Sequence, residues 1–293
     1  MRAAVLDIGS NTARLLVAEA RGGRIVPVRK EKVYLGLGAE ILHRGAIGEA
    51  KLAETADVAR TFAKLARKSG ADETDVLVTA PGRQAANPEA LLATVARASG
   101  TVARIVSARE EGELAFEGAV LAENVRERRV AVCDVGGGST EIVVGEAGRA
   151  SSFGTSVELG SLRLTAALLP DDPPGRRAIA AAERLAHDLF ADVDPPPAEV
   201  ALAVGGSARA LAKLVGTTLG EPELTRALAL SGGKRSAKVA RAFDLDVQRA
   251  RVLPAGAIVL REVTRRLGQP LQLARGGLRE AAVARMLAAA RAA

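Results

Sequence analysis

The sequence has little of several residue types that commonly carry chemistry. Among its 293 residues are one cysteine, two histidines and no tryptophan, and aromatic residues make up only 2%. The single Cys133 has no disulfide partner, which is typical of a protein from a reducing compartment. His43 and His187 lack metal-ligand spacing, and neither completes a Ser-His-Asp or Cys-His arrangement. We therefore expect both histidines to be structural or solvent-facing.

Long apolar runs are also missing. No run reaches the length of a membrane span, and the chain starts with a strand pattern instead of a cationic signal region. We expect a soluble, cytoplasmic protein with no membrane partner. Hydrophobic residues make up 48% and charged residues 26%, so with few aromatics the core is predicted to be mainly Ala, Leu and Val. The length favours two domains.

Acidic residues are outnumbered by basic ones. The formal net charge is +7, which suits a polyanionic partner. Nucleic acid is not the expected partner, because stacking aromatics are nearly absent and no zinc, helix-turn-helix or RNP-type pattern occurs. The arginines are spread along Ala-rich amphipathic segments, and this distribution also fits a compositional bias of the source.

What the sequence does contain is a glycine-rich turn between apolar segments, present twice. The copies are Ala4-Val5-Leu6-Asp7-Ile8-Gly9-Ser10-Asn11-Thr12 and Val132-Cys133-Asp134-Val135-Gly136-Gly137-Gly138-Ser139-Thr140-Glu141. Glycines let the main chain expose N–H groups that wrap an anion such as phosphate. One copy alone fits an ordinary β-hairpin equally well. Two copies, each with an aspartate closing an apolar strand, favour two related phosphate-binding halves.

The spacing of apolar residues predicts the order βββαβαβα over residues 1–123, a layered α/β domain. Expected strands are Ala3–Asp7, Thr12–Ala20, Arg24–Tyr34, Asp75–Thr79 and Val102–Ser107, and expected helices are 49–69, Pro88–Ser99 and 109–123.

The second half repeats this pattern with more helices. Expected strands are Arg129–Asp134, Ile142–Gly145, Ala150–Val157, Glu199–Val204 and Leu271–Ala274, and expected helices are 161–168, 175–190, Ala208–Leu214, 235–250, 254–267 and Leu278–Arg291. We predict domains at 1–122 and 123–279, with the helix 280–293 packing back on the first domain.

The two loops resemble those of the exopolyphosphatase and guanosine pentaphosphate phosphohydrolase (Ppx/GppA) family, within the actin, sugar kinase and heat-shock-protein ATPase superfamily. Other segments that resemble family motifs, in family order, are Thr79–Asn87, Ser107–Glu111, Leu159–Leu164, Gly205–Ser207, Leu253–Ala257 and Gly277–Glu280. The resemblance implies two duplicated ribonuclease H-like, actin-like domains with an interdomain cleft, in a short two-domain form that is a homodimer.

Two departures from the family pattern stand near these motifs. Gly112 and Glu113 occupy positions where many members have Ala and Arg, which is expected to change how the site contacts substrate. Pro81-Gly82 is an unusual pair, so the segment presenting Arg83 is expected to be shaped differently.

Phosphate oxygens are expected at the backbone N–H groups and hydroxyls of both loops and at one guanidinium. The predicted phosphate-binding residues are Gly9, Ser10, Asn11, Thr12, Arg83, Gly136, Gly137, Gly138, Ser139 and Thr140. Asn87 is a possible partner of Arg83. Further arginines are expected to line a channel or to lie on the surface: Arg109, Arg163 and Arg279.

Asp7, Asp134 and Glu141 are the candidate ligands for Mg²⁺ or Mn²⁺, because hard cations prefer carboxylate oxygens and water. The resemblance implies that Asp134 and Glu141 are the nearest ligands and that Asp7 orients the other loop. An aspartate at a strand end also fits a simple turn cap.

The acidic run at residues 109–113 reads by itself as the exposed first turn of a helix, where carboxylates are favoured. The resemblance instead implies that Glu111, rather than Glu110, is the general base that takes a proton from the attacking water.

The expected activity is that of an exopolyphosphatase, a metal-dependent hydrolase that cleaves the terminal phosphoanhydride of inorganic polyphosphate. Hydrolysis of guanosine pentaphosphate (pppGpp) by the same apparatus is the nearest alternative. Two other classes are an actin-like ATPase or kinase and a non-catalytic polyphosphate or alarmone sensor. Glu111 and the ordered motifs disfavour the first, and the intact acidic residues disfavour the second.

Overall fold

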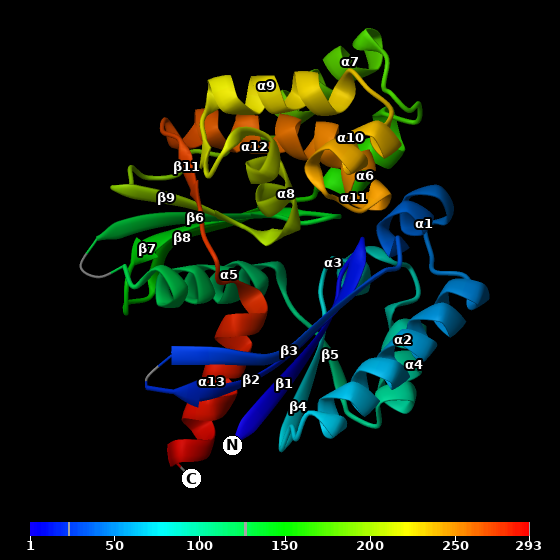
Figure 1. Cartoon of the computed structure of the whole chain (residues 1–293), viewed down its shortest axis with the longest axis vertical. Helices are drawn as coiled ribbons and strands as arrows, with labels where there is room; N and C mark the ends of the chain where they lie inside the picture. Colours follow the sequence, from blue (N-terminus) through cyan, green and yellow to red (C-terminus); the bar gives the residue numbers. More distant parts are fainter. Residues whose placement is uncertain (23, 126–127, 293) are drawn as a thin grey trace. The chain divides into compact units, whose positions relative to one another are not determined.

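The chain forms two compact units. The computed structural model describes residues 1–22, 24–125 and 128–292. Unit 1 contains Met1–Leu114 and the C-terminal segment from Leu278, and unit 2 is Ala115–Gly277. Each unit is built on a mixed sheet flanked by helices (Figure 1), so the predicted α/β class is confirmed. Within the described residues, no helix combines the length and apolar character that a membrane span requires.

The sheet of unit 1 has the strand order β3-β2-β1-β4-β5. Its first three strands form an antiparallel meander, and the last two run parallel to β1 and to each other. The strands are β1 (Arg2–Ile8), β2 (Thr12–Arg21), β3 (Arg24–Tyr34), β4 (Glu73–Val78) and β5 (Ala103–Ile105). This order places the end of β1, and the turn that follows it, beside the end of β4.

Helices cover both faces of this sheet, which explains why β1 is apolar at consecutive positions instead of alternating. One core lies under α2 (Glu49–Lys68) and α4 (Pro88–Ser99), and it includes Phe62 and Leu91. A second core lies under α13 (Leu278–Ala292), whose residues pack against Ala3 and Val5 of β1. Two shorter helices complete the unit: α1 (Leu37–Arg44) and α3 (Ala80–Gln84).

Unit 2 repeats the same sheet and adds one edge strand. Its order is β10-β11-β9-β6-β7-β8, in which β8-β7-β6-β9-β11 corresponds to β3-β2-β1-β4-β5 of unit 1. The strands are β6 (Arg129–Val135), β7 (Thr140–Glu146), β8 (Ser151–Val157), β9 (Val200–Val204), β10 (Thr218–Leu219) and β11 (Leu271–Leu273). Equivalent strands thus lead into both glycine-rich turns.

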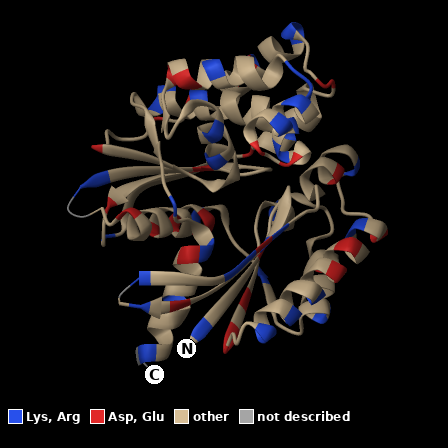
Figure 2. Cartoon of the chain, in the orientation of Figure 1, with Lys and Arg blue, Asp and Glu red and all other residues tan. Residues whose placement is uncertain are grey.

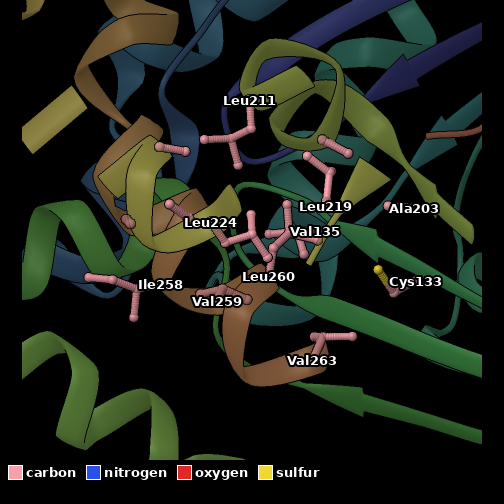
Figure 3. Packing of buried hydrophobic residues seen from close by; sticks show 14 of the residues in the cluster. Cys133, Val135, Ala203, Leu211, Leu219, Leu224, Ile258, Val259, Leu260 and Val263 are labelled. Carbon is pink, nitrogen blue, oxygen red and sulfur yellow. The ribbon is translucent and has the colours of Figure 1, made fainter. Parts of the chain in front are cut away.

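The main core of unit 2 is aliphatic, as the composition predicts. Val259, Leu260 and Val263 of the long helix α12 pack in the same cluster as Cys133 and Val135 of β6 (Figure 3). Burial raises the pKa of the Cys133 thiol, with the neighbouring Asp134 charge adding to the effect, so the thiol stays protonated. The helices are α6 (Ser161–Leu168), α7 (Arg176–Leu189), α8 (Gly205–Val215), α9 (Glu221–Gly232), α10 (Ser236–Phe243), α11 (Val247–Arg251) and α12 (Leu253–Leu267).

The other face of this sheet is covered by α5 (Ala108–Glu123), which contains the boundary between the units. Its residues Ala115, Phe116 and Ala119 pack against β6 and β9. Here two stretches of backbone touch. A Cβ at Gly118 would lie 2.0 Å from the Gly277 carbonyl oxygen, and a Cβ at Gly276 would lie 1.8 Å from the Gly118 oxygen. Only glycines fit this contact.

Nearly all predicted strands and helices are confirmed, with shifts of a few residues at their ends. The helix predicted over 235–250 is wrong: it is two helices, broken where Asp244 adopts a left-handed φ of 49°. An aspartate tolerates this conformation and disfavours a helix interior. The prediction also missed four elements, α1, α3, α9 and β10.

Candidate active site

The turn after β1, loop 1 (Gly9–Thr12), is closed by its own backbone. The Gly9 N–H donates to the Thr12 carbonyl oxygen at 3.0 Å. The loop carbonyls point to the segment that follows β3: Asn11 O accepts from Leu35 N at 3.0 Å, and Ser10 O accepts from Gly38 N at 2.8 Å. The loop is therefore fixed before any ligand binds.

Loop 1 carries two buried polar groups without a partner. Ser10 Oγ and Asn11 Nδ2 find no hydrogen-bonding atom among the described residues. An unsatisfied buried group costs about 1–3 kcal/mol, so such groups indicate a ligand with oxygen acceptors. Thr12 Oγ1 accepts from Arg14 Nε at 3.2 Å, and this bond leaves the hydroxyl proton of Thr12 free to donate elsewhere.

The turn after β6, loop 2 (Gly136–Thr140), has the same closing bond. Gly136 N–H donates to Ser139 O at 3.0 Å. Unlike loop 1, it is braced by the first amides of α6: Ser161 N donates to Gly136 O at 2.9 Å, and Leu162 N donates to Gly137 O at 3.0 Å. With these carbonyls engaged by α6, the loop is held in one conformation.

Thr140, a predicted phosphate-binding residue, uses its hydroxyl within the fold. Its Oγ1 donates to Leu159 O at 2.6 Å, and the residue is fully buried. The next segment also fits closely, because a Cβ at Gly160 would lie 2.4 Å from the carbonyl carbon of Gly137. The Thr140 hydroxyl therefore braces loop 2.

Asp134 lies at the end of β6, against the first residue of α8. Gly205 has a φ of +87°, and a Cβ there would lie 2.2 Å from Asp134 Oδ1. A glycine is required both by the conformation and by the approach of the carboxylate. The positive end of the α8 dipole stabilises a negative charge at this position.

Glu141 is the direct neighbour of Asp134 across the antiparallel pair β6–β7. Residues in this register point to the same face of the sheet. Glu141 is only 2% exposed, and its Oε1 accepts from Ser156 Oγ at 3.0 Å. No group of three His, Cys, Asp or Glu side chains suited to a metal occurs in the described part of the chain. Two adjacent carboxylates still suit Mg²⁺, which usually takes one or two carboxylates, waters and substrate phosphates.

The equivalent pair in loop 1 has a different charge. Asp7 on β1 is opposite Arg14 on β2, in the register that places Asp134 opposite Glu141. Arg14 was not among the predicted site residues, although the sequence carries a signal for it: Arg14 follows Asp7 by the same spacing as Glu141 follows Asp134. The register thus pairs an acid with a base in unit 1 and two acids in unit 2.

Arg83 and Glu111 form a half-buried ion pair. Arg83 Nη1 donates to Glu111 Oε2 at 2.7 Å and to Val106 O at 2.8 Å, and the side chains are 15% and 13% exposed. Gly82 explains the unusual pair before Arg83, because a Cβ there would lie 2.9 Å from Ile105 Cγ1. The tight packing of α3 on β5 brings Arg83 to Glu111.

This segment lies beside loop 1. Thr79, which precedes α3, donates its N–H to Ile8 O at 3.1 Å, and its Oγ1 would lie 3.7 Å from a Cβ at Gly9. The order β2-β1-β4 thus brings loop 1 and the start of α3 to the same edge of the unit 1 sheet.

The two adjacent acids of α5 have separate partners. Ser107 Oγ caps the helix by accepting from Glu110 N at 3.1 Å. The Glu110 carboxylate accepts from Arg104 at 2.7 Å on the outer side, whereas Glu111 turns to Arg83. The reading of this run as a solvated helix start fits Glu110. Glu111 occupies a more enclosed, polar position.

Several residues considered for the site have other contacts. The Asn87 amide makes two 2.9 Å hydrogen bonds with the backbone of Ile47. Arg109 pairs with Glu113 at 2.8 Å on the surface, and this hydrogen bond raises the pKa of Arg109. His187, 64% exposed, lies 3.3 Å from Glu262. Asn87 is thus structural, and the Gly112-Glu113 departure adds a surface ion pair.

Comparison with known proteins is consistent with this geometry. A model of the Ppx/GppA phosphatase family matches residues 16–290. The chain belongs to this family. Exopolyphosphatase 1 of Mycobacterium tuberculosis is 32% identical over 98% of this chain and 88% of the relative. Its Mycobacterium leprae counterpart is 29% identical over 98% and 90%.

Solved structures of family members have the same fold. The Aquifex aeolicus member of the Ppx/GppA family aligns over 99% of this chain and 98% of its own, with 25% identity and a TM-score of 0.81. An exopolyphosphatase from Cytophaga hutchinsonii aligns over 99% and 98%, with 19% identity and a TM-score of 0.86. The predicted family membership is confirmed.

Proposed function

We propose that this protein is an exopolyphosphatase, a hydrolase acting on phosphoric anhydrides that releases orthophosphate from the end of inorganic polyphosphate. The main support is its similarity, over nearly the whole chain, to proteins named exopolyphosphatase. The unsatisfied donors of loop 1 and the paired carboxylates of loop 2 fit a phosphate substrate. We also propose that the two units correspond to the two predicted domains and that the enzyme is a cytoplasmic homodimer.

In this proposal, loop 1 binds phosphate oxygens through Ser10 Oγ, Asn11 Nδ2 and the Thr12 hydroxyl. In loop 2 the Gly136 N–H closes the turn by donating to Ser139 O, so the backbone N–H groups of Gly137–Ser139 supply the contacts, and Thr140 braces the turn. Donors held in place before binding need no reorganisation when charge develops on the phosphoryl group.

Glu111 is proposed as the general base that accepts a proton from the attacking water. Its ion pair with Arg83 holds the carboxylate in one position, and a carboxylate within hydrogen-bond reach of the attacking water can accept its proton. Arg83 is also a candidate phosphate ligand, because a guanidinium can hold a carboxylate and a phosphate oxygen at different N–H groups. The pair thus connects the base to the substrate.

Asp134 and Glu141 would hold Mg²⁺ or Mn²⁺, with Asp7 acting to orient loop 1. When bound, such a cation neutralises charge on the phosphate oxygens and on the leaving chain. The protein's own contribution is to keep the two carboxylates adjacent: Gly205 leaves room for Asp134, and Ser156 orients Glu141.

Hydrolysis of pppGpp is the second candidate, because the family whose model matches this chain is named for GppA as well as Ppx. The decisive experiment measures phosphate release from long-chain polyphosphate, tripolyphosphate, pppGpp and ATP, each with Mg²⁺ and with EDTA. We expect release from polyphosphate that requires the cation. Preference for pppGpp would replace the proposal by the second candidate, and activity on ATP alone would contradict both.

The same assay tests the base. Glu111→Gln should reduce kcat by about 10²–10⁴-fold, the range for loss of a general base. Glu110→Gln is the matched control, because this neighbouring acid pairs with Arg104 on the outer side, and its rate should stay within about twofold of wild type. Equal rates in wild type and Glu111→Gln would refute the assignment.

A further inference from the structure

Six exposed cations gather on unit 2, away from loop 2. They belong to the start of α7, the link between α9 and α10, and α10 itself, where basic residues cluster in Figure 2. The packing of Gly232 near Ile179 and Pro174 brings these segments together. We name this set the α10 basic surface: Arg176, Arg177, Lys234, Arg235, Lys238 and Arg241.

Among the described residues, these cations are not neutralised by acids. Within the described residues, none of the six forms an ion pair. Elsewhere, exposed arginines are commonly neutralised by a nearby carboxylate, as in Arg149–Glu146 and Arg265–Glu221. Six unneutralised positive charges are thus gathered together in a chain whose formal net charge is +7. Such a face attracts a polyanion.

Two acids near this surface, Asp172 and Asp244, are engaged in other contacts. Asp172 accepts from Ser236 N at 2.8 Å and from Ser236 Oγ at 2.6 Å, so it already caps α10. Asp244 lies 3.4 Å from Lys213 Nζ. The first amide of α10 is therefore occupied, and any anion on this surface would be bound by lysine and arginine side chains.

A short helix connects loop 2 to this surface. The first residues of α6 brace Gly136 and Gly137, and α6 ends at Leu168. Its eight residues span about 12 Å at 1.5 Å per residue. Beyond it, Arg251 donates to Pro170 O at 2.7 Å, and Asp172 reaches α10. The α10 basic surface is thus connected to loop 2 through α6 and the segment that follows it.

We propose that the α10 basic surface binds the distal part of a long polyphosphate chain whose end is at the phosphate-binding loops. This inference rests on the proposed function and adds a determinant of chain-length preference. An inorganic chain is favoured over a nucleic acid because the one aromatic residue of α10, Phe243, packs against the core of unit 2, whereas single-stranded nucleic acids bind by stacking on aromatics. Polyphosphate needs only spaced cations.

The test replaces three of these cations together, in Lys234→Gln/Lys238→Gln/Arg241→Gln. The matched control is Lys64→Gln/Arg67→Gln/Lys68→Gln, which removes the same charge from the exposed end of α2 in unit 1. Two readouts are measured over a range of salt concentrations: binding of long-chain polyphosphate to the intact protein, and KM for long-chain polyphosphate relative to tripolyphosphate.

We expect the α10 variant to bind long-chain polyphosphate at least tenfold more weakly at low salt. The slope of log Kd against log salt should fall by about 2, since each lost phosphate contact on a single strand contributes about 0.7. KM should rise for the long chain much more than for tripolyphosphate. The α2 control should match wild type in both readouts.

Three results would overturn the inference. Equal polyphosphate binding by the α10 variant and wild type would show that the α10 basic surface does not bind the chain. Equal losses of binding in the α10 and α2 variants would show that only the net charge of the protein matters. Tighter binding of single-stranded RNA than of polyphosphate, lost only in the α10 variant, would assign the surface to nucleic acid. Failure of hydrolysis on every substrate would instead reject the proposed function, and the binding readout would still decide this surface.

Discussion

Loop 1 and loop 2 have the same backbone frame and opposite charge patterns. In each, an aspartate is the penultimate residue of a buried strand. A glycine two residues later closes the turn by donating its N–H to the carbonyl oxygen three residues further on. The residue opposite the aspartate differs: Arg14 in loop 1 and Glu141 in loop 2. One loop pairs an acid with a base, and the other pairs two acids.

This difference indicates a division of roles. Two adjacent carboxylates repel each other unless a cation lies between them, so loop 2 suits a divalent ion. In loop 1, Asp7 has a positive neighbour, and the unsatisfied donors of Ser10 and Asn11 suit direct contact with phosphate oxygens. Duplication explains why the two loops have the same backbone conformation. The residue opposite the aspartate determines whether the loop suits a divalent cation or direct contact with phosphate.

The largest effect is expected when loop 2 is given the charge pattern of loop 1. Glu141→Arg places a guanidinium beside Asp134, where the proposed cation binds. We expect kcat/KM for polyphosphate to fall by about 10³-fold, because a ligand is lost and a repulsive charge is added. Steady-state rates at several Mg²⁺ concentrations measure this. Glu146→Gln, on the exposed end of the same strand, is the control, and a comparable loss there would contradict the account.

The second-largest effect is expected where a glycine next to one of the loops leaves no room for a side chain. Gly205→Ala combines a φ of +87° with a 2.2 Å clash against Asp134, so we expect unfolding free energy to fall by about 3 kcal/mol and activity to fall with it. Gly9→Ala meets only a 3.3 Å contact in loop 1 and should cost less. Urea unfolding of both variants, with Gly175→Ala as a neutral control in open space, gives the ranking; the reverse order would be inconsistent with it.

Removing a hydroxyl from loop 1 and removing one from loop 2 should change the stability of the protein in opposite directions. Ser10→Ala removes an unsatisfied buried group, so the protein should gain about 1 kcal/mol of stability while kcat/KM drops about tenfold. Thr140→Val removes the 2.6 Å bond to Leu159 and should lose about 1–2 kcal/mol. Thermal unfolding and initial rates measured on the same samples test this contrast. Destabilisation by Ser10→Ala would show that its hydroxyl has a structural partner.

The smallest effect is expected at Arg14. Arg14→Gln keeps a donor for Thr12 and removes the positive neighbour of Asp7. KM should rise about threefold to tenfold, the effect of one partly exposed charge on an anionic substrate, and kcat should change little. An unchanged KM would mean that the charge contrast at this position has no role in binding substrate.

Much of this arrangement could be predicted from the sequence because it is local. The glycine turns and the strands that flank them depend on neighbouring residues, and they are where the sequence places them. The break at Asp244 was missed because apolar spacing continues across it, and α9 was not predicted as an element.

The long-range contacts were not predictable in this way. The Arg83–Glu111 ion pair joins residues far apart in sequence, and it depends on the absence of a side chain at Gly82. The engagement of Thr140 with Leu159 likewise follows from how α6 packs against loop 2. The different charges of Arg14 and Glu141 could be seen at equivalent positions in the sequence. Only the strand register shows that each residue lies opposite the aspartate of its loop.

Cation binding by loop variants tests the division of roles most directly. Mn²⁺ is titrated into the intact protein in the presence of inorganic phosphate, with free Mn²⁺ followed by electron paramagnetic resonance, for wild type, Glu141→Gln and Asp7→Asn. The account predicts that Glu141→Gln weakens Mn²⁺ binding at least tenfold, the usual cost of disturbing a metal site, and that Asp7→Asn changes it by less than about threefold. Equal weakening by both variants would contradict the assignment of the cation to loop 2.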